Sequence, residues 1–182
     1  MDGLRERKKS ATRLALHEAA LRLALEHGPD RVTVESIADA ASVSRRTFSN
    51  YFAGKEEAIS YGDLLRLRRL LDLVRSQPPG PPRPALAAAA ERLVTEDFDP
   101  DWLTRRRLIA RHPALVAHQA AAYAAVERDL AAEITDRTDD ANPLRARVLA
   151  ATFLATLRAT TQYWLDHPDR PLAELVVEAL SG

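Results

Sequence analysis

The segment TVESIADAASVSRRTFSNYF, residues 33–52, holds the start signals of two short helices separated by a tight turn. Thr33 can cap a helix over residues 34–40, and Ser44 can cap a second helix over residues 45–52. The apolar pairs placed to pack across these two caps are Val32 with Ile37 and Val43 with Phe48. Two capped short helices joined by about three residues form a helix-turn-helix.

Helical periodicity continues through nearly all of the chain, and no segment shows the strict alternation of a strand. A first helix is expected from Ser10 to His27, because Gly28 can adopt a left-handed conformation and Pro29 cannot continue the helix. Further helices are expected over residues 55–75, 85–96, 100–111, 113–138, 143–166 and 171–180, several of them starting at a proline. The predicted fold class is therefore all-α, with about nine helices.

A proline-rich stretch divides the chain. Five prolines fall within the eight residues from Gln77 to Pro84, where they disfavour helix and favour a stiff spacer. The expected organisation is a helix-turn-helix region over residues 10–54, a connecting helix over 55–77, a linker over 78–84 and a second helical region over 85–182.

Charge is distributed unevenly although the net charge is zero. Residues 1–55 contain ten Lys and Arg against seven Asp and Glu, an excess of +3, and the remaining residues carry the balancing −3. A basic N-terminal region suits a nucleic-acid partner. The absence of cysteine and of a long uncharged apolar run predicts a cytoplasmic protein that does not enter the membrane.

The sequence contains no pattern that indicates an enzyme. The five histidines lack metal-ligand spacing, and His112 and His118 are six residues apart, which places them on different helical faces. There is no glycine-rich phosphate loop and no nucleophile elbow. We therefore expect no enzyme activity, no catalytic residues, no metal and no cofactor.

The second short helix has one apolar and one polar face. Phe48 and Phe52 are four residues apart and should face the core with Leu16, Ile37 and Ala41. The opposite face carries Arg45, Arg46, Ser49 and Asn50, side chains that can donate hydrogen bonds to base edges in a major groove. Solvated charges on an ordinary surface helix would give the same pattern.

The region from Thr12 to Glu57 resembles the DNA-binding region of the TetR family. The matching residues are Ala19-Ala20, Gly28, Thr33-Val34, Ile37-Ala38, Ala41, Val43-Ser44, Thr47, Tyr51-Phe52 and Lys55-Glu56. Two positions depart from the family pattern: Ser42 replaces a usual glycine, and Ser49 replaces a common aromatic residue. The resemblance implies a transcription regulator, in most cases a repressor, that binds double-stranded DNA as a homodimer and responds to a small-molecule effector.

Carried onto this chain, the resemblance gives a set of DNA-binding candidates: Thr33, Ser44, Arg45, Arg46, Thr47, Ser49, Asn50, Tyr51 and Lys55. Arg45 or Arg46 could pair with guanine, and Asn50 could pair with adenine. Thr47, Tyr51 and Lys55 are expected at phosphates. A basic arm formed by Lys8, Lys9 and Arg13 is expected at the backbone or the minor groove.

The C-terminal region is expected to form the dimer and the effector site. The helix over residues 143–166 is apolar on two sides, so one side can face its own core and the other, with residues 171–180, a partner subunit. Burial within the monomer is the alternative. Candidate pocket residues are Trp102, Arg105, Arg106, Tyr123, Phe153, Thr156, Thr160 and Trp164. The aromatic members could instead be core, and the arginines could be a solvated face.

A second resemblance suggests the effector class. The stretches Arg45–Phe48, Arg111–Leu115, Glu127-Arg128 and Leu144–Arg147 are similar to actinobacterial TetR regulators related to the mycofactocin-system regulator. That resemblance implies an acyl-coenzyme A-like, anionic effector. The competing function is a helical protein-interaction module without DNA binding, which the retained Arg45, Arg46, Tyr51 and Lys55 argue against.

Overall fold

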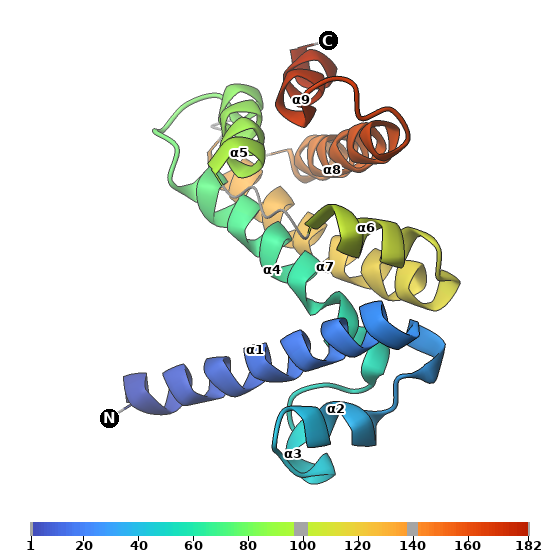
Figure 1. Cartoon of the computed structure of the whole chain (residues 1–182). Coiled ribbons are helices and arrows are strands. Elements are labelled where there is room, and N and C mark those ends of the chain that lie inside the picture. The colour runs from blue at the N-terminus through green and yellow to red at the C-terminus, as the bar shows by residue number, and fades with distance from the viewer. Residues whose placement is uncertain (1, 97–101, 138–141, 182) are drawn as a thin grey trace. The chain divides into compact units, whose positions relative to one another are not determined.

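The computed structural model describes residues 2–96, 102–137 and 142–181. Within these ranges the chain forms nine α-helices, one short 3-10 helix and no strand, which confirms the predicted all-α class (Figure 1). In chain order the helices are α1 (Asp2–His27), η1 (Pro29–Arg31), α2 (Val34–Ala40), α3 (Arg45–Ser49), α4 (Lys55–Arg75), α5 (Pro82–Glu96), α6 (Trp102–Ala110), α7 (Pro113–Asp136), α8 (Pro143–Asp166) and α9 (Leu172–Ser181).

The helices pack into two compact units. The first, here called the head, comprises Met1–Leu64 and Thr104–Gln119, and the second, the body, comprises Leu65–Leu103 and Ala120–Gly182. Helices α4, α6 and α7 each contribute to both units. These units differ from the expected division at the proline-rich stretch, because parts of α6 and α7 pack with the head. The functional division expected from the sequence remains a prediction.

The core of the head is formed by apolar side chains from α1, α2, α3 and the start of α4. Leu16, Ile37 and Phe48 are at most 1% exposed, and Phe52 and Ala41 pack in the same cluster, as predicted. Burying each large apolar side chain contributes about 1.5–3 kcal/mol to stability. Because one side of α3 is fixed in this core, its opposite side faces outward.

Helix α1 starts earlier than predicted, at Asp2 rather than Ser10. Residues 4–12 contain good helix formers and no proline, so nothing in the sequence stops the helix from extending toward the N-terminus. Ser10, the predicted first residue, lies within the helix. The predicted C-terminal end is confirmed, since Gly28 follows α1 with a φ of 82°.

Helix α3 ends at Ser49, three residues before the predicted end at Phe52. The amide of Asn50 donates to the Thr47 carbonyl, and the amide of Tyr51 donates to the Phe48 carbonyl. Both hydrogen bonds span three residues rather than four, so the backbone tightens into a turn there. Asn50 consequently lies at the C-terminal cap of α3.

Other helix bounds agree with expectation or move by a few residues. Those of α4 and α8 are confirmed. Helix α5 begins at Pro82 rather than Ala85, because prolines are tolerated in the first turn, whose N–H groups need no partner inside the helix. Helices α6, α7 and α9 are offset by one or two residues. The predicted bounds Pro100 and Thr138 lie outside the described residues.

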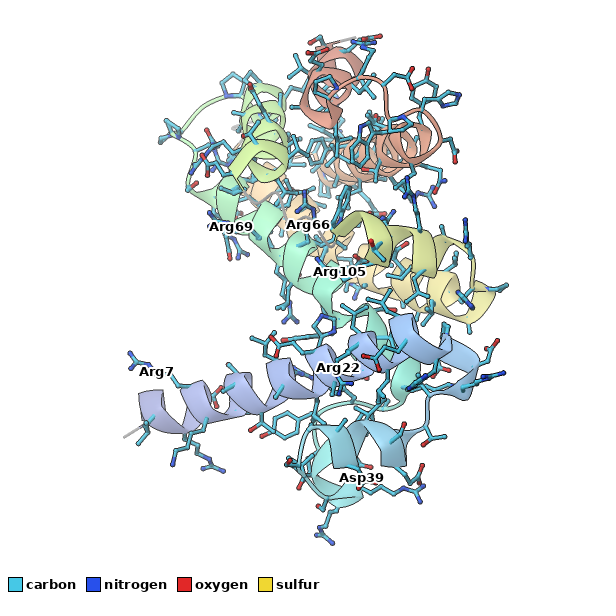
Figure 2. All side chains as sticks on the ribbon, in the orientation of Figure 1. Arg7, Arg22, Asp39, Arg66, Arg69 and Arg105 are labelled. Carbon is cyan, nitrogen blue, oxygen red and sulfur yellow. The ribbon has the colours of Figure 1, made fainter. Side chains whose placement is uncertain are left out.

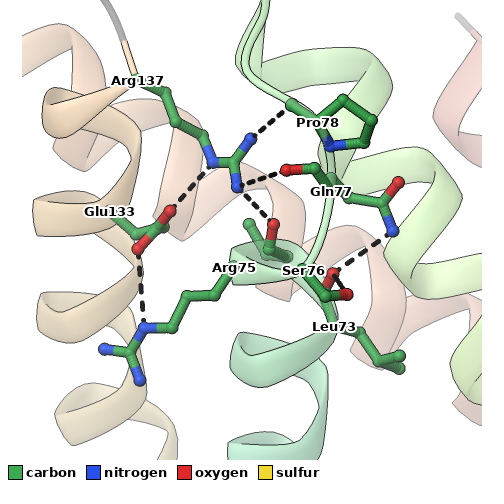
Figure 3. Close-up of polar contacts among 8 residues, drawn as sticks. Leu73, Arg75, Ser76, Gln77, Pro78, Glu133 and Arg137 are labelled. Atoms are coloured by element: carbon green, nitrogen blue, oxygen red, sulfur yellow. Dashed lines mark hydrogen bonds and ion pairs between the residues drawn. The ribbon is translucent and has the colours of Figure 1, made fainter.

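Arg137 holds the C-terminal end of α4 within the body (Figure 3). Its guanidinium donates to the carbonyl oxygens of Val74, Gln77 and Pro78, which include groups left without partners inside the helix. Its Nε donates to Glu133 at 2.9 Å. A cation at this end also interacts favourably with the helix dipole, so this arginine stabilises the end of α4 beside the proline-rich stretch.

Helix α8 has one buried face and one exposed apolar stripe. Ala146, Ala150, Phe153 and Leu154 are buried, and α8 packs against α9. Leu144 is 70% exposed and Val148 is 56% exposed, which is unusual for large apolar side chains on a well-packed helix. The two-sided apolar character predicted for this helix is confirmed, and its outer side is available to a partner.

Candidate nucleic-acid interface and effector groove

Two hydroxyl caps set the positions of α2 and α3. The Thr33 hydroxyl accepts from the Ser36 amide at 3.1 Å, and the Ser36 hydroxyl accepts from the Thr33 amide at 3.1 Å. The Ser44 hydroxyl accepts from the Thr47 amide at 3.0 Å and also hydrogen-bonds the Thr47 hydroxyl at 2.9 Å. The predicted caps are therefore confirmed. Thr33 and Ser44 thus have structural roles at helix starts whatever they contact in DNA.

The turn between α2 and α3 contains one strained residue. Ser42 has a φ of 54° and is the one non-glycine residue with a positive φ in the described part of the chain. This backbone conformation favours glycine, because a Cβ atom crowds the following carbonyl. A glycine at this position would adopt the same φ without strain, whereas Ser42 carries a Cβ atom in this conformation.

The outward face of α3 carries the predicted base-reading side chains. Arg45, Arg46, Ser49 and Asn50 are all exposed. The Arg45 guanidinium forms an ion pair with Glu35 of α2 at 3.0 Å, and both side chains are more than half exposed. Such a surface pair is weak and exchangeable. The face therefore presents guanidinium and amide donors at the surface, while the Ser49 hydroxyl donates to the Arg45 carbonyl at 3.2 Å.

Two basic residues expected near DNA, Lys55 and Arg13, have side-chain contacts within the head. The Lys55 ammonium donates to the Pro29 carbonyl at 2.9 Å and to the Asp30 carbonyl at 3.4 Å. Arg13 donates to the Tyr51 carbonyl at 2.7 Å, and its guanidinium lies over the rings of Phe52 and Tyr61. Arg13 is therefore part of the packed head and not of an extended basic arm. Lys8 belongs to α1 and is exposed.

A basic groove lies between the N-terminal part of α1 and the end of α3. It has a volume of about 650 Å³. The residues that line it are Leu4, Arg5, Lys8, Lys9, Thr12, Thr47, Asn50 and Tyr51. The groove thus brings three predicted DNA-binding residues, Thr47, Asn50 and Tyr51, together with Lys8 and Lys9 of the predicted basic arm. Arg5 was missed at the sequence level, although its spacing of three and four residues from Lys8 and Lys9 was a usable signal.

A neutral histidine is buried where α1 packs on α4. His17 is 6% exposed, and its Nδ1 donates to the Ala58 carbonyl at 2.7 Å. Burial lowers its pKa, and the nearby Arg105 adds to that effect, while the Ala58 hydrogen bond, Glu18 and Asp63 oppose it. A Cβ atom on Gly62 would lie 2.8 Å from its Nε2. Gly62 is therefore required for the histidine to fit.

The same part of the head contains a buried ion pair. Arg106 donates to Asp63 at 3.3 Å, Gln119 donates to the same carboxylate oxygen, and all three residues are at most 9% exposed. This contact joins α4 to α6 and α7 within the head. Arg106, a predicted pocket residue, is thus held by Asp63 through one Nη atom, and among the described residues its buried Nε has no acceptor.

The body contains an open groove of about 740 Å³ between α5, α8 and α9. Its walls are mainly apolar, with Leu86, Leu149, Phe153 and Leu180 among them. Arg83 and Arg145 supply two cationic groups, and Thr152 and Thr156 supply hydroxyls. Of the predicted pocket residues, Phe153 and Thr156 line this groove. Arg83 and Arg145 were missed, because their approach depends on tertiary packing between helices distant in sequence.

Two other predicted pocket residues form a separate aromatic cluster in the body. Trp102 and Trp164 stack with their ring centroids 5.9 Å apart, and the Arg66 guanidinium lies 4.7 Å from the Trp102 ring centroid. Among the described residues, the buried Trp102 indole N–H has no acceptor, so it could serve a ligand. The remaining candidates, Arg105, Tyr123 and Thr160, are not among the residues that line the groove.

None of the described helices combines the length and the apolar character that a membrane span requires. Over the same residues, no three acidic, histidine or cysteine side chains converge as a metal site would need.

Comparisons with known proteins place these features in a family. The family profile described as "Bacterial regulatory proteins, tetR family" matches residues 16–59, and the profile described as "MftR C-terminal domain" matches residues 82–182. The HTH-type transcriptional regulator TcmR of Streptomyces glaucescens is 31% identical over 96% of this chain and 82% of its own length.

Two further proteins are similar over nearly the whole chain. The mycofactocin biosynthesis transcriptional regulator MftR of Mycobacterium tuberculosis is 32% identical over 92% of this chain and 87% of its own. The solved structure of Thermus thermophilus FadR in complex with lauroyl-CoA has the same fold, with a TM-score of 0.59 and 24% identity over 93% of this chain and 91% of that chain. The chain therefore belongs to the TetR family of bacterial transcriptional regulators, which bind DNA and small-molecule effectors, typically as dimers.

Proposed function

We propose that the protein is a cytoplasmic repressor that binds a pseudo-palindromic operator as a homodimer and is released by an amphipathic, anionic effector. The observation that carries the proposal is the exposed face of α3: Arg45 and Arg46 are exposed on a helix held by the Ser44 cap, and Asn50 is exposed at its C-terminal cap. A short helix that presents such donors fits the major groove.

Within this surface, we assign some residues to base recognition and others to phosphate binding. Arg46 is exposed and can pair with guanine, as can Arg45 once it leaves Glu35. Asn50 can pair with adenine. Thr47, Tyr51 and Lys55 are assigned to phosphates, with Ser49 at the edge of the face. Thr33 and Ser44 would act mainly through their caps.

Dimerisation is assigned to the outer stripe of α8 together with α9. Leu144, Val148 and Tyr163 on α8 and Val177 on α9 are each at least 45% exposed. Leu144 and Val148 also line the open groove of the body, so the proposed seam would share part of the groove's wall. Covering this apolar surface with a second copy would remove it from water. A two-fold dimer also explains how two α3 helices could occupy successive major grooves about 34 Å apart.

The effector is assigned to the apolar groove of the body. Its long apolar wall suits an acyl chain, and the two arginines at positions 83 and 145 suit a phosphate or carboxylate group. Release requires the effector to bind the DNA-incompetent state more tightly. Because α4 runs without interruption through both units, we propose that it carries the change to the head.

A gel-shift titration tests the DNA-binding proposal. Duplexes would be selected from a random library by the wild-type protein and compared with the DNA upstream of its own gene. We expect salt-sensitive binding to a two-fold symmetric sequence. Failure to shift any duplex at low salt would favour the alternative, a helical protein-interaction module.

The effector class needs its own test. Lauroyl-coenzyme A, coenzyme A alone and laurate would be added to the preformed DNA complex. We expect only the first to release DNA at micromolar concentration, because it alone offers both the acyl chain and the phosphates. Variants Arg83→Ala and Phe153→Ala should raise the concentration needed, whereas Arg128→Ala, on another helix, should not. Equal release by laurate would show that the phosphates are not recognised.

A further inference from the structure

The first turns of α1 lack a packing partner within the head. Residues 3–11 are all exposed, although the helix is continuous from Asp2. A helical segment this short is marginal in water without tertiary contacts. Arg5 lies in the first turn, where the helix dipole disfavours a cation, and Arg7, Lys8 and Lys9 follow it in the second turn. The first turns of α1 therefore form a charged segment that is not stabilised by packing against the rest of the head.

Most of these cations share one side of the helix. Arg5, Lys8 and Lys9 are spaced by three and four residues, as groups on one helical face are, and all three line the groove that faces the end of α3. Arg7 is not among the lining residues, and Figure 2 shows it on the side of α1 away from α3. The charge is directed into the groove.

The opposite wall of this groove belongs to the DNA-reading element. Thr47, Asn50 and Tyr51 supply a hydroxyl, an amide and a phenol there. The backbone of Tyr51 is held in place by the hydrogen bond that Arg13 donates to its carbonyl. No carboxylate is among the residues that line the groove. The groove is therefore a cationic channel with neutral hydrogen-bond donors along its second wall.

The length of the cationic face suits a repeating anion. Arg5 and Lys9 are separated by about 6 Å along the helix axis, at 1.5 Å per residue. One DNA strand carries a charge every 3.4 Å or so of duplex axis, so the face can hold more than one phosphate. Because α3 forms one wall, a strand lying in the groove would border the bases that α3 reads.

We propose that this groove is a docking site for one phosphodiester strand of duplex DNA, and that bound DNA stabilises the first turns of α1. The site acts on the backbone, so it adds affinity without base preference. The proposal deepens the proposed function and rests on it for the orientation of α3 toward DNA.

The test compares two arginines of the same helical segment. Arg5→Ala removes a charge inside the groove, and Arg7→Ala removes the same charge from the other side of α1. A triple variant, Arg5→Ala with Lys8→Ala and Lys9→Ala, gives the full effect. Fluorescence anisotropy would measure affinity between 50 and 200 mM salt for a selected duplex and for a random-sequence duplex.

We expect Arg5→Ala to flatten the plot of log affinity against log salt, and Arg7→Ala to change it much less. Loss of one phosphate contact in each protomer of a dimer should reduce the slope by about 1.8, at about 0.9 per contact. The ratio of selected to random-duplex affinity should stay the same. Circular dichroism should show gain of helix on DNA binding in the wild type and less gain in the triple variant.

The outcomes separate this proposal from the proposed function. If the wild type prefers the selected duplex but Arg5→Ala and Arg7→Ala behave alike, the groove proposal is overturned and the operator function stands. If the wild type binds only random DNA and Arg5→Ala weakens that binding, the groove stands and specific repression fails. Absence of binding to either duplex at 50 mM salt overturns both. Misfolding is controlled, because removing cations at a helix N-terminus favours the helix.

Discussion

Arginine has different roles on the DNA face of the head and inside the body. Arg46 is exposed on α3, and Arg45 there has only an exposed ion pair. In the body, the Arg137 side chain is 9% exposed, and its guanidinium is enclosed by Glu133 and three backbone carbonyls. A desolvated guanidinium must keep its partners, whereas a solvated one can exchange water for phosphate or a base. Burial, and not residue type, therefore separates the arginine that holds the fold together from the arginines that we propose bind DNA.

Removing the buried arginine should give the largest effect on stability. Arg137→Met keeps the aliphatic bulk but removes the guanidinium donor from the carbonyls at the end of α4 and leaves Glu133 with Arg75 alone. We expect a loss of about 3 kcal/mol in the free energy of unfolding, measured with urea. The control Arg92→Met breaks an exposed pair with Glu96 on the surface of the body and should leave stability nearly unchanged. Equal losses in both variants would mean that burial does not make the difference.

The exposed arginine should show the reverse behaviour. Arg46→Ala removes a solvated side chain from α3, so the free energy of unfolding should stay within about 0.5 kcal/mol of the wild type. Operator affinity should fall by about 1–3 kcal/mol, with relaxed preference at one base position. Anisotropy titrations with single-base operator variants would show this. An unchanged base preference would reassign Arg46 to a phosphate.

The buried histidine of the head, His17, should make the stability of the protein depend on pH. His17 is held neutral by burial, so the unfolded chain, with a pKa near 6.5, binds its proton first as the pH falls. Stability should therefore decline below about pH 6.5, with a slope of up to about 1.4 kcal/mol per pH unit until the lowered pKa of the folded state is reached. Above that range the contribution is constant.

Urea unfolding of the wild type and His17→Gln between pH 5 and 8 measures this contribution. The glutamine variant can be less stable at every pH, but the stability difference should shrink as the pH falls. A difference that is constant with pH would show that His17 does not titrate between the two states.

The smallest effect is expected from the exposed ion pair of the head. Glu35→Gln should free Arg45, whose ion pair it removes, and also remove a negative charge near the DNA face. Random-duplex affinity should rise by a few tenths of a kcal/mol, and stability should barely change, since exposed pairs contribute about 0.2–1 kcal/mol. Anisotropy at low salt measures this, with Glu26→Gln on α1 as the matched charge control. A loss of affinity would instead make Glu35 a residue that positions Arg45.

The features predicted well from sequence were those with local causes. Thr33 and Ser44 cap helices whose hydrogen bonds lie within three residues, and Gly28 ends α1 through its own backbone conformation. These signals need no knowledge of distant contacts. The start of α1 was missed because its first turns have no packing that would give an apolar periodicity.

The contacts that sequence could not supply join distant segments. Asp63 and Arg106 are 43 residues apart, and Arg137 reaches carbonyls about 60 residues away. Nothing in an arginine-rich sequence shows which guanidinium becomes buried. For the same reason, Arg83 and Arg145 were not predicted to line the groove of the body, and the predicted Arg106 lies instead in an ion pair of the head.

The central claim is that the outward face of α3 enters two successive major grooves. Methylation-protection footprinting of the selected duplex tests it directly, because guanine N7 lies in the major groove. We expect protection in two short segments separated by about one helical turn, with the protected guanine signal lost in Arg46→Ala. Protection of a single segment, or protection that survives in Arg46→Ala and Arg45→Ala alike, would contradict the account.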